Sequence, residues 1–234
     1  MSASRLKGKP LLEINKLPII CHVVKKAKET GIGEVIVATE DKEIMTAVEK
    51  NGGKVILTGK HNTGTDRIFE AFQKLKIKDV DYVLNLQGDE PMIDPKDIIN
   101  LNNLMIKNNS EIGTLASVIK ENTILNNENV VKVITKEKLE KNSFTKAINF
   151  SRKNLSKQNS NIYHHIGIYA YKISVLEKFI NLNQTKNEIE NHLEQLRALD
   201  NKITIMVALA ESSPIGVDTK EDFLAIKKIM EYKT

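Results

Sequence analysis

The chain has 234 residues, a formal net charge of +5 and a single cysteine, Cys21, which excludes an internal disulfide framework and a cysteine-cluster metal site. Lysines and acids are interspersed and no basic stretch is interleaved with aromatic residues, so we do not expect nucleic acid as a partner. No window is apolar enough to span a membrane and the N-terminus is polar, so the expected location is the cytoplasm.

The first hundred residues alternate between helical and strand patterns. Pro18 can open a helix that continues to about Thr30, and Asp41 can cap a second helix. The alternation predicts a parallel, doubly wound sheet. The elements expected here are helices over about 18–30, 42–51, 65–75 and 95–107, and strands over 34–39, 54–58 and up to Gln87.

The pattern changes after residue 111, where short strands with short polar connections follow one another. We therefore predict an α/β fold with a Rossmann-like core (about 1–111 and 201–234), a mostly parallel sheet, and a β-rich insertion over about 112–200. The expected elements are strands over 112–119, 129–136, 145–151, 163–173 and 203–210, a loop over 153–161, and helices over 174–182, 187–200 and 220–232.

Two carboxylates follow a buried strand in the segment Gln87-Gly88-Asp89-Glu90-Pro91. Side chains at the carboxyl end of a central strand are where α/β proteins bind ligands. Mg²⁺ commonly uses one or two protein carboxylates together with substrate phosphates, so Asp89 is a candidate ligand. Asp218, which follows Gly216, is a second candidate, although it could equally cap the helix that begins near Lys220.

Near the N-terminus, Arg5 and Lys9 lie on either side of Gly8. Glycine permits close approach of the backbone to a phosphate, and the two cations can offset its charge. A solvated turn would have the same composition. Together with the two aspartates, this loop is consistent with a site for phosphoryl or nucleotidyl transfer.

Taken in order, the motifs resemble the CMP-Kdo synthetases, cytidylyltransferases that activate 3-deoxy-manno-octulosonate (Kdo). The segments Leu193-Glu194-Gln195-Leu196-Arg197 and Gly216-Val217-Asp218-Thr219 are the more specific part of the resemblance. The other matching segments are Ser4 to Leu11, Gly64-Thr65-Asp66-Arg67, Asn85 to Pro91, Val131-Lys132-Val133, Phe150-Ser151-Arg152 and His165 to Tyr171.

The resemblance implies a nucleotidyltransferase fold and transfer of CMP from CTP to Kdo, with release of pyrophosphate, for lipopolysaccharide synthesis in a homodimer that forms through the insertion. It implies that Lys9, Asp89 and Asp218 are catalytic and that the two aspartates bind Mg²⁺. The implied nucleotide-binding residues are Ser4, Arg5, Lys9 and Arg67. The implied residues of the sugar-acid pocket are Gln87, Arg152, His165, Tyr169, Glu194 and Gln195.

Each of these roles has a simpler alternative. His165 could be a core histidine, Glu194 and Gln195 plain helix surface, and Arg67 part of a helix start. The acceptor could be another sugar acid, such as amino-substituted Kdo or a sialic acid. A non-catalytic nucleotide-binding homologue is the alternative from a different class of protein.

The sequence also departs from the family pattern at its beginning. The family has an apolar strand ending in Pro-Ala-Arg immediately before the loop that opens this chain, and this strand and its arginine are not in the sequence. Either the recorded start is too late or the protein lacks its first strand. Lys7 stands where the family usually has proline.

Overall fold

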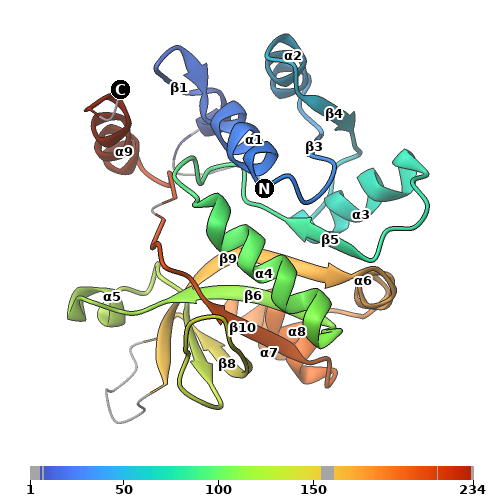
Figure 1. The fold of residues 1–234 in the computed structure, drawn as a ribbon, viewed down its shortest axis with the longest axis vertical. Coiled ribbons are helices and arrows are strands. Elements are labelled where there is room, and N and C mark those ends of the chain that lie inside the picture. Colours follow the sequence, from blue (N-terminus) through green and yellow to red (C-terminus); the bar gives the residue numbers. More distant parts are fainter. Residues whose placement is uncertain (1–5, 7, 154–160, 215, 233–234) are drawn as a thin grey trace. The chain divides into compact units, whose positions relative to one another are not determined.

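A computed structural model of the chain describes residue 6 and residues 8–153, 161–214 and 216–232 (Figure 1). The chain forms two compact units. Unit 1 comprises residues 1–78, 87–98 and 214–234, and unit 2 comprises residues 79–86 and 99–213. The chain passes from unit 1 to unit 2 after residue 78 and again after residue 98, and the second point lies within helix α4 (Pro95–Asn108).

Unit 1 is built around helix α1, which packs apolar side chains into two clusters. Ile19 joins a buried cluster with Ile14, Val217 and Ile226, whereas the neighbouring Cys21 joins a second cluster. Each fully buried branched side chain contributes roughly 1.5–3 kcal/mol. The elements of unit 1 are η1 (Lys9–Leu11), β1 (Glu13–Ile14), β2 (Leu17–Pro18), α1 (Ile19–Glu29), β3 (Ile36–Thr39), α2 (Lys42–Lys50), β4 (Lys54–Leu57), α3 (Gly64–Leu75) and α9 (Lys220–Tyr232).

Unit 2 contains a six-stranded mixed sheet in the order β5-β9-β6-β10-β8-β7, and the additional pairing of β9 with β7 closes five of these strands into a ring. All six residues of β6 are buried, including the polar residues Thr114 and Ser117. The elements of unit 2 are β5 (Tyr82–Asn85), β6 (Ile112–Ser117), α5 (Asn122–Asn126), β7 (Lys132–Thr135), β8 (Phe144–Ser151), β9 (Ile162–Lys172), α6 (Ile173–Ile180), α7 (Lys186–Asn191), α8 (Gln195–Asp200) and β10 (Ile205–Leu209).

The predicted α/β class is confirmed, but the prediction of a mostly parallel sheet is wrong for the described residues. Only β3–β4 and β6–β10 pair in parallel there. The long strand β9 runs antiparallel to β5, β6 and β7, and so it determines most of the pairing. Helix–strand alternation predicts parallel neighbours only when each strand pairs with the next along the chain, and β5 instead pairs with a strand more than 75 residues later.

Several local predictions hold and others fail. Asp41 caps α2 by accepting hydrogen bonds from the Glu43 and Ile44 amides, as expected. The single helix expected over 187–200 is instead α7 and α8, because His192 adopts a left-handed conformation with φ of 52° and ends α7. The β1–β2 pairing and α5 were not predicted.

The ends of the chain and of the sheets bear on two further expectations. In the described part of the chain β5 pairs only with β9, so it lies at the end of the sheet order and not at its centre, where it was expected. No strand precedes β1 among the described residues. The absence of a first strand and the division of the chain at residues 112 and 200 stay predictions, and the expected loop over 153–161 lies mostly outside the described residues.

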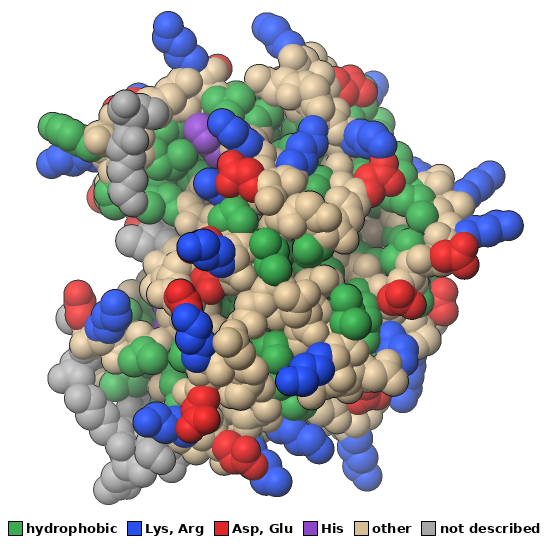
Figure 2. All heavy atoms as spheres, in the orientation of Figure 1, with side chains coloured by type: hydrophobic (Ala, Val, Ile, Leu, Met, Phe, Trp, Pro, Cys, Tyr) green, Lys and Arg blue, Asp and Glu red, His purple; other side chains and the backbone are tan. Residues whose placement is uncertain are grey.

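The surface bears out the interspersed charge pattern. On the face drawn in Figure 2, Lys and Arg side chains lie among Asp and Glu side chains and do not gather into a large patch of one sign. Within the part of the chain that the structure describes, no helix combines the length and the apolar character needed to cross a membrane.

Candidate active site

In unit 1, the side chains of Lys9, Asp89 and Asp218 meet. The Lys9 ammonium group donates a short hydrogen bond to Asp89 Oδ2 and a second one, of 3.0 Å, to Asp218 Oδ1. The Lys9 and Asp89 side chains are 14% and 23% exposed, whereas that of Asp218 is 65% exposed. Three residues far apart in the sequence therefore form one charged cluster that opens to solvent on the side of Asp218.

Two glycine-containing loops place these side chains. Gly8 has a φ of 68°, a conformation that favours glycine, and η1 begins directly after it with Lys9. A Cβ atom at Gly88 would lie 2.8 Å from Ile20 Cδ1, so a larger residue there would require the Ile20 side chain on α1 to shift. The Val217 amide donates a 2.9 Å hydrogen bond to the Asp89 carbonyl, which joins the two aspartate loops.

Sequence alone left open whether the Asp218 side chain caps helix α9 or belongs to the site, and the structure shows a different cap. The N-terminus of α9 is capped by Thr219, whose hydroxyl accepts from the Asp222 amide, while the Asp222 carboxylate accepts from the Thr219 and Asp218 amides. This reciprocal pattern is a capping box, and Thr219-Lys220-Glu221-Asp222 displays it in the sequence. The cap therefore does not need the Asp218 side chain, which instead contacts Lys9.

A third carboxyl group, that of Glu90, completes the cluster. Burial raises the pKa of Glu90 to about 8, and the charges of Asp89 and Asp218 add to this rise while Lys9 opposes it. Glu90 Oε2 is buried without a hydrogen-bond partner among the described residues. Burial lowers the pKa of Lys9, but its contacts with the two aspartates outweigh burial and leave the pKa above its usual value. Near neutral pH the cluster therefore holds a charged lysine, two aspartates and a protonated Glu90.

These donors fit a hard cation of the Mg²⁺ type. Carboxylate oxygens are the preferred protein ligands of Mg²⁺, which usually takes one or two of them and completes its shell with water and substrate phosphates. Within the described residues, no group of three His, Cys, Asp or Glu side chains is arranged to hold a metal ion by itself. Asp89 and Asp218, which share one cation in Lys9, are the residues that could hold such an ion.

A second cluster lies in unit 2, around His165 on β9. Its ring packs edge-on against Phe150 at 5.1 Å and lies 5.4 Å from the ring of Tyr169. Burial, together with the positive charges of His164 and Arg152, lowers the pKa of His165 to about 3. His165 is therefore neutral near pH 7, and Arg152 lies close enough to act on it.

The Tyr169 hydroxyl belongs to the same cluster. It is buried without a hydrogen-bond partner among the described residues. Burial raises the pKa of Tyr169 well above its usual value, and Tyr171 and Glu194 contribute to this rise. The structure thus places His165 in ring contact with Tyr169, and the charges of Arg152 and Glu194 act on these two residues; all four were predicted for the sugar-acid pocket.

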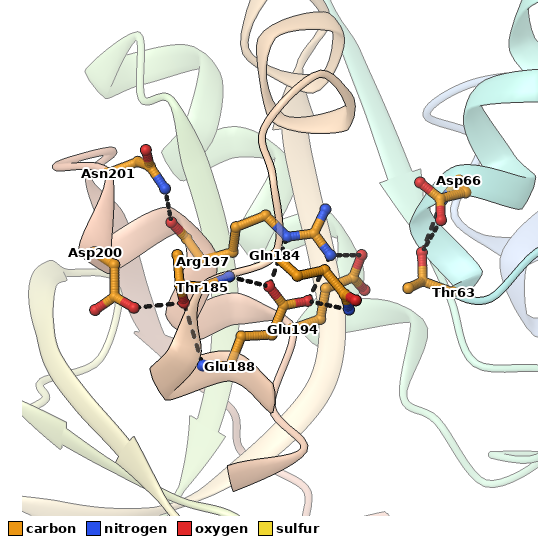
Figure 3. A network of polar contacts seen from close by, with 9 residues as sticks. All are labelled: Thr63, Asp66, Gln184, Thr185, Glu188, Glu194, Arg197, Asp200 and Asn201. Atoms are coloured by element: carbon orange, nitrogen blue, oxygen red, sulfur yellow. Dashed lines mark hydrogen bonds and ion pairs between the residues drawn. The ribbon is translucent and has the colours of Figure 1, made fainter. Parts of the chain in front are cut away.

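A buried ion pair supports the segment that carries Glu194. Figure 3 shows Arg197 and Glu188 facing each other, and Arg197 Nε donates a 2.8 Å hydrogen bond to Glu188 Oε2. Glu188 also forms a capping box with Thr185 at the start of α7. The guanidinium group of Arg197 lies 4.8 Å above the centre of the Phe179 ring and 3.8 Å from Glu194 Oε1. The arrangement connects α7 and α8 across the break at His192.

The remaining predicted residues are not gathered into either cluster. Arg67 Nη2 lies 3.3 Å from Glu40 Oε2, and its buried Nε has no hydrogen-bond partner among the described residues. Gln87 is exposed and belongs to unit 1, and Gln195 is the first residue of α8. Ser4 and Arg5 lie outside the described residues.

Comparison with known proteins identifies the family to which the chain belongs. A family profile described as "Cytidylyltransferase" matches residues 1–205. A curated 3-deoxy-manno-octulosonate cytidylyltransferase from Thermodesulfovibrio yellowstonii is 42% identical and covers 97% of this chain and 94% of its own length. The chain belongs to this family. A second family member, from Bartonella tribocorum, is 39% identical and covers 98% of this chain and 95% of its own length.

Solved structures extend the comparison to the fold. A CMP:2-keto-3-deoxy-manno-octonic acid synthetase in complex with CTP is 34% identical, with a TM-score of 0.89, and the match covers 99% of this chain and 95% of the other. An apo-UDP-glucose pyrophosphorylase is 14% identical with a TM-score of 0.73, and it shares only the fold; the match covers 100% of this chain and 96% of the other. The α/β nucleotidyltransferase fold predicted from the resemblance is therefore confirmed.

Proposed function

We propose that this chain transfers CMP from CTP to Kdo and releases pyrophosphate. The anomeric hydroxyl of the sugar acid attacks the α-phosphate, and the bond to the pyrophosphate leaving group breaks. The observation that carries the proposal is the convergence of Asp89 and Asp218 on Lys9 in a member of this family. The CTP in the related synthetase structure supports CTP as the nucleotide substrate.

The charge of the cluster favours a divalent cation. With Glu90 protonated, one lysine and two aspartates leave a net charge of about −1, which repels a triphosphate. We therefore assign Asp89 and Asp218 as the residues that hold Mg²⁺. When bound, this ion would neutralise phosphate charge and polarise the phosphorus centre.

The side chains of this protein would position the reactants. Lys9 would supply a positive charge for the triphosphate, a role it would share with Ser4, Arg5 and Arg67. Arg152 would pair with the sugar carboxylate. Glu194, Gln87 and Gln195 would bind sugar hydroxyls, because a carboxylate accepts hydrogen bonds and an amide both donates and accepts. From the family resemblance we also propose a cytoplasmic homodimer that acts in lipopolysaccharide synthesis.

The test is pyrophosphate release by the purified chain, with CTP and Mg²⁺ and with either Kdo or sialic acid as acceptor. We expect turnover with Kdo, none with sialic acid, and none when Mg²⁺ is replaced by a chelator. Turnover with sialic acid alone would identify another sugar-acid cytidylyltransferase. CTP binding without turnover on any acceptor would indicate a non-catalytic homologue.

The Asp89→Asn variant tests the metal assignment. Asparagine keeps the size of the side chain but removes the charge, so we expect activity to fall at least about 100-fold while the circular dichroism spectrum stays unchanged. The matched control is Asp81→Asn, an exposed aspartate of unit 2, which should keep the parent activity. Full activity in Asp89→Asn would refute the assignment.

A further inference from the structure

Thr114 is a fully buried polar residue of β6 that no part of the proposed reaction uses. Its Oγ1 lies 2.7 Å from the Ile168 carbonyl oxygen, 3.3 Å from that of Ile166 and 3.0 Å from His165 Nε2. The register between β6 and β9 shifts directly after Thr114, where Gly167 and Ile168 form a bulge. The bulge turns carbonyl groups of β9 toward this hydroxyl.

Counting hydrogen atoms determines the direction of each bond. A threonine hydroxyl carries one hydrogen, and carbonyl oxygens can only accept. The hydroxyl hydrogen therefore goes to the carbonyl groups, chiefly to Ile168 at 2.7 Å. The remaining contact at 3.0 Å requires His165 Nε2 to donate. A neutral imidazole with its hydrogen on Nε2 keeps a lone pair on Nδ1.

The surroundings of His165 leave this lone pair available. In the part of the chain that the structure describes, His165 Nδ1 has no hydrogen-bond partner. The aromatic rings of Phe150 and Tyr169 flank the imidazole. The buried Tyr169 hydroxyl also lacks a partner within the described residues. A ligand hydroxyl suits this environment, because it can donate to one group and accept from another.

We propose that Thr114 is a positioning residue that fixes His165 as the Nε2–H tautomer, so that His165 Nδ1 accepts a hydrogen bond from a hydroxyl group of the sugar-acid substrate. The second half of the proposal rests on the proposed function. A carboxylate could not take this place, because it has no hydrogen to give to Nδ1. Arg152 then binds the substrate carboxylate, and His165 accepts a hydrogen bond from a substrate hydroxyl.

The first experiment needs no substrate. Nitrogen-15 NMR of the imidazole rings distinguishes a protonated nitrogen from an unprotonated one, and the His165 signals are assigned by their loss in His165→Gln. We expect Nε2 to be protonated and Nδ1 unprotonated near neutral pH. Addition of Kdo should then shift the Nδ1 signal. A proton on Nδ1, or an Nδ1 signal that Kdo does not move, overturns the proposal whether or not the enzyme turns over.

The second experiment uses Thr114→Val, which removes the hydroxyl at nearly constant volume. We expect loss of the single tautomer and a rise of about 3- to 10-fold in the KM for Kdo, which corresponds to one hydrogen bond. The KM for CTP should not change. Thr114→Ser keeps a hydroxyl and should restore both the tautomer and the KM.

The matched control is Thr145→Val, a buried threonine of β8 whose hydroxyl accepts from the Glu137 amide. The Thr145→Val variant also loses one buried hydroxyl in unit 2, and its KM for Kdo should match that of the parent. An equal rise in both valine variants would assign Thr114 a purely structural role. If Thr114→Val does not fold, the parent spectrum and its response to Kdo still decide the proposal.

Discussion

Burial of His165 should make the stability of the protein fall steeply below neutral pH. The pKa of this histidine is held at about 3, first by burial and then by the charges of His164 and Arg152, whereas in an unfolded chain it is about 6.5. Because the folded-state pKa is depressed, the neutral ring favours folding above the unfolded pKa, and this stabilisation is lost as the pH falls below it. From about pH 7.5 to about pH 5 the loss is about 2 kcal/mol, because the unfolded state takes up a proton and the folded state does not.

The assay is chemical denaturation at both pH values, compared with the His165→Gln variant. Glutamine can still donate to the Thr114 hydroxyl but does not titrate, so the difference between the two proteins isolates His165 from His164, whose pKa burial also lowers. We expect the parent to lose about 2 kcal/mol more than the variant. If parent and variant lose the same stability, His165 is not held neutral by burial and the reasoning is wrong.

Three further substitutions test the packing that supports the two clusters. Arg197→Met leaves Glu188 buried without its charged partner and should lower the free energy of unfolding by about 3–5 kcal/mol in denaturant titrations. Gly113→Ala places a Cβ against methionine and leucine side chains of α4 and should cost about 1–3 kcal/mol, measured in the same way. Thr219→Ala removes the cap of α9 and should cost about 0.5–2 kcal/mol by thermal unfolding.

Each of these substitutions has a control. Gly33→Ala adds the same methyl group where no atom lies within 4 Å and should be nearly neutral. For Arg197→Met, the added change Glu188→Leu removes the stranded charge, so the double variant should recover part of the loss. Thr219→Ser keeps the hydroxyl and should behave like the parent. An unchanged midpoint in Arg197→Met would mean that the buried pair contributes nothing to folding.

The sequence predicts elements better than it predicts their pairing, for physical reasons. Helix α9 was predicted over the residues it occupies, because its periodicity and its start are local features. The partners of β9 were not predictable, because they are selected by packing between segments far apart in the chain. The break at His192 was missed because a histidine with positive φ carries no local signal comparable to glycine.

In the site, too, local features were predictable from the sequence and long-range contacts were not. The capping box at Thr219 was visible in the sequence, and recognising it would have freed Asp218 for another role. Asp89, Asp218 and the loop of Lys9 were grouped by their shared chemistry and by the family resemblance, since no local pattern relates these residues. Thr114 could not be found at all, because its contact with His165 spans 51 positions and depends on a bulge.

The two clusters differ in charge near neutral pH, and this difference affects how the protein can select one sugar acid over another. The unit 1 cluster contains a charged lysine and aspartates, whereas His165 and Tyr169 in unit 2 are neutral. Kdo and sialic acid each carry one carboxylate, so the ion pair that we propose for Arg152 would be similar with both and would not distinguish them. Discrimination must therefore come from neutral donors and acceptors whose directions are fixed, because a misplaced hydroxyl leaves them buried and unpaired. A histidine held in one tautomer has such a fixed direction, whereas a freely titrating histidine would accept a hydrogen bond at one pH and donate one at another.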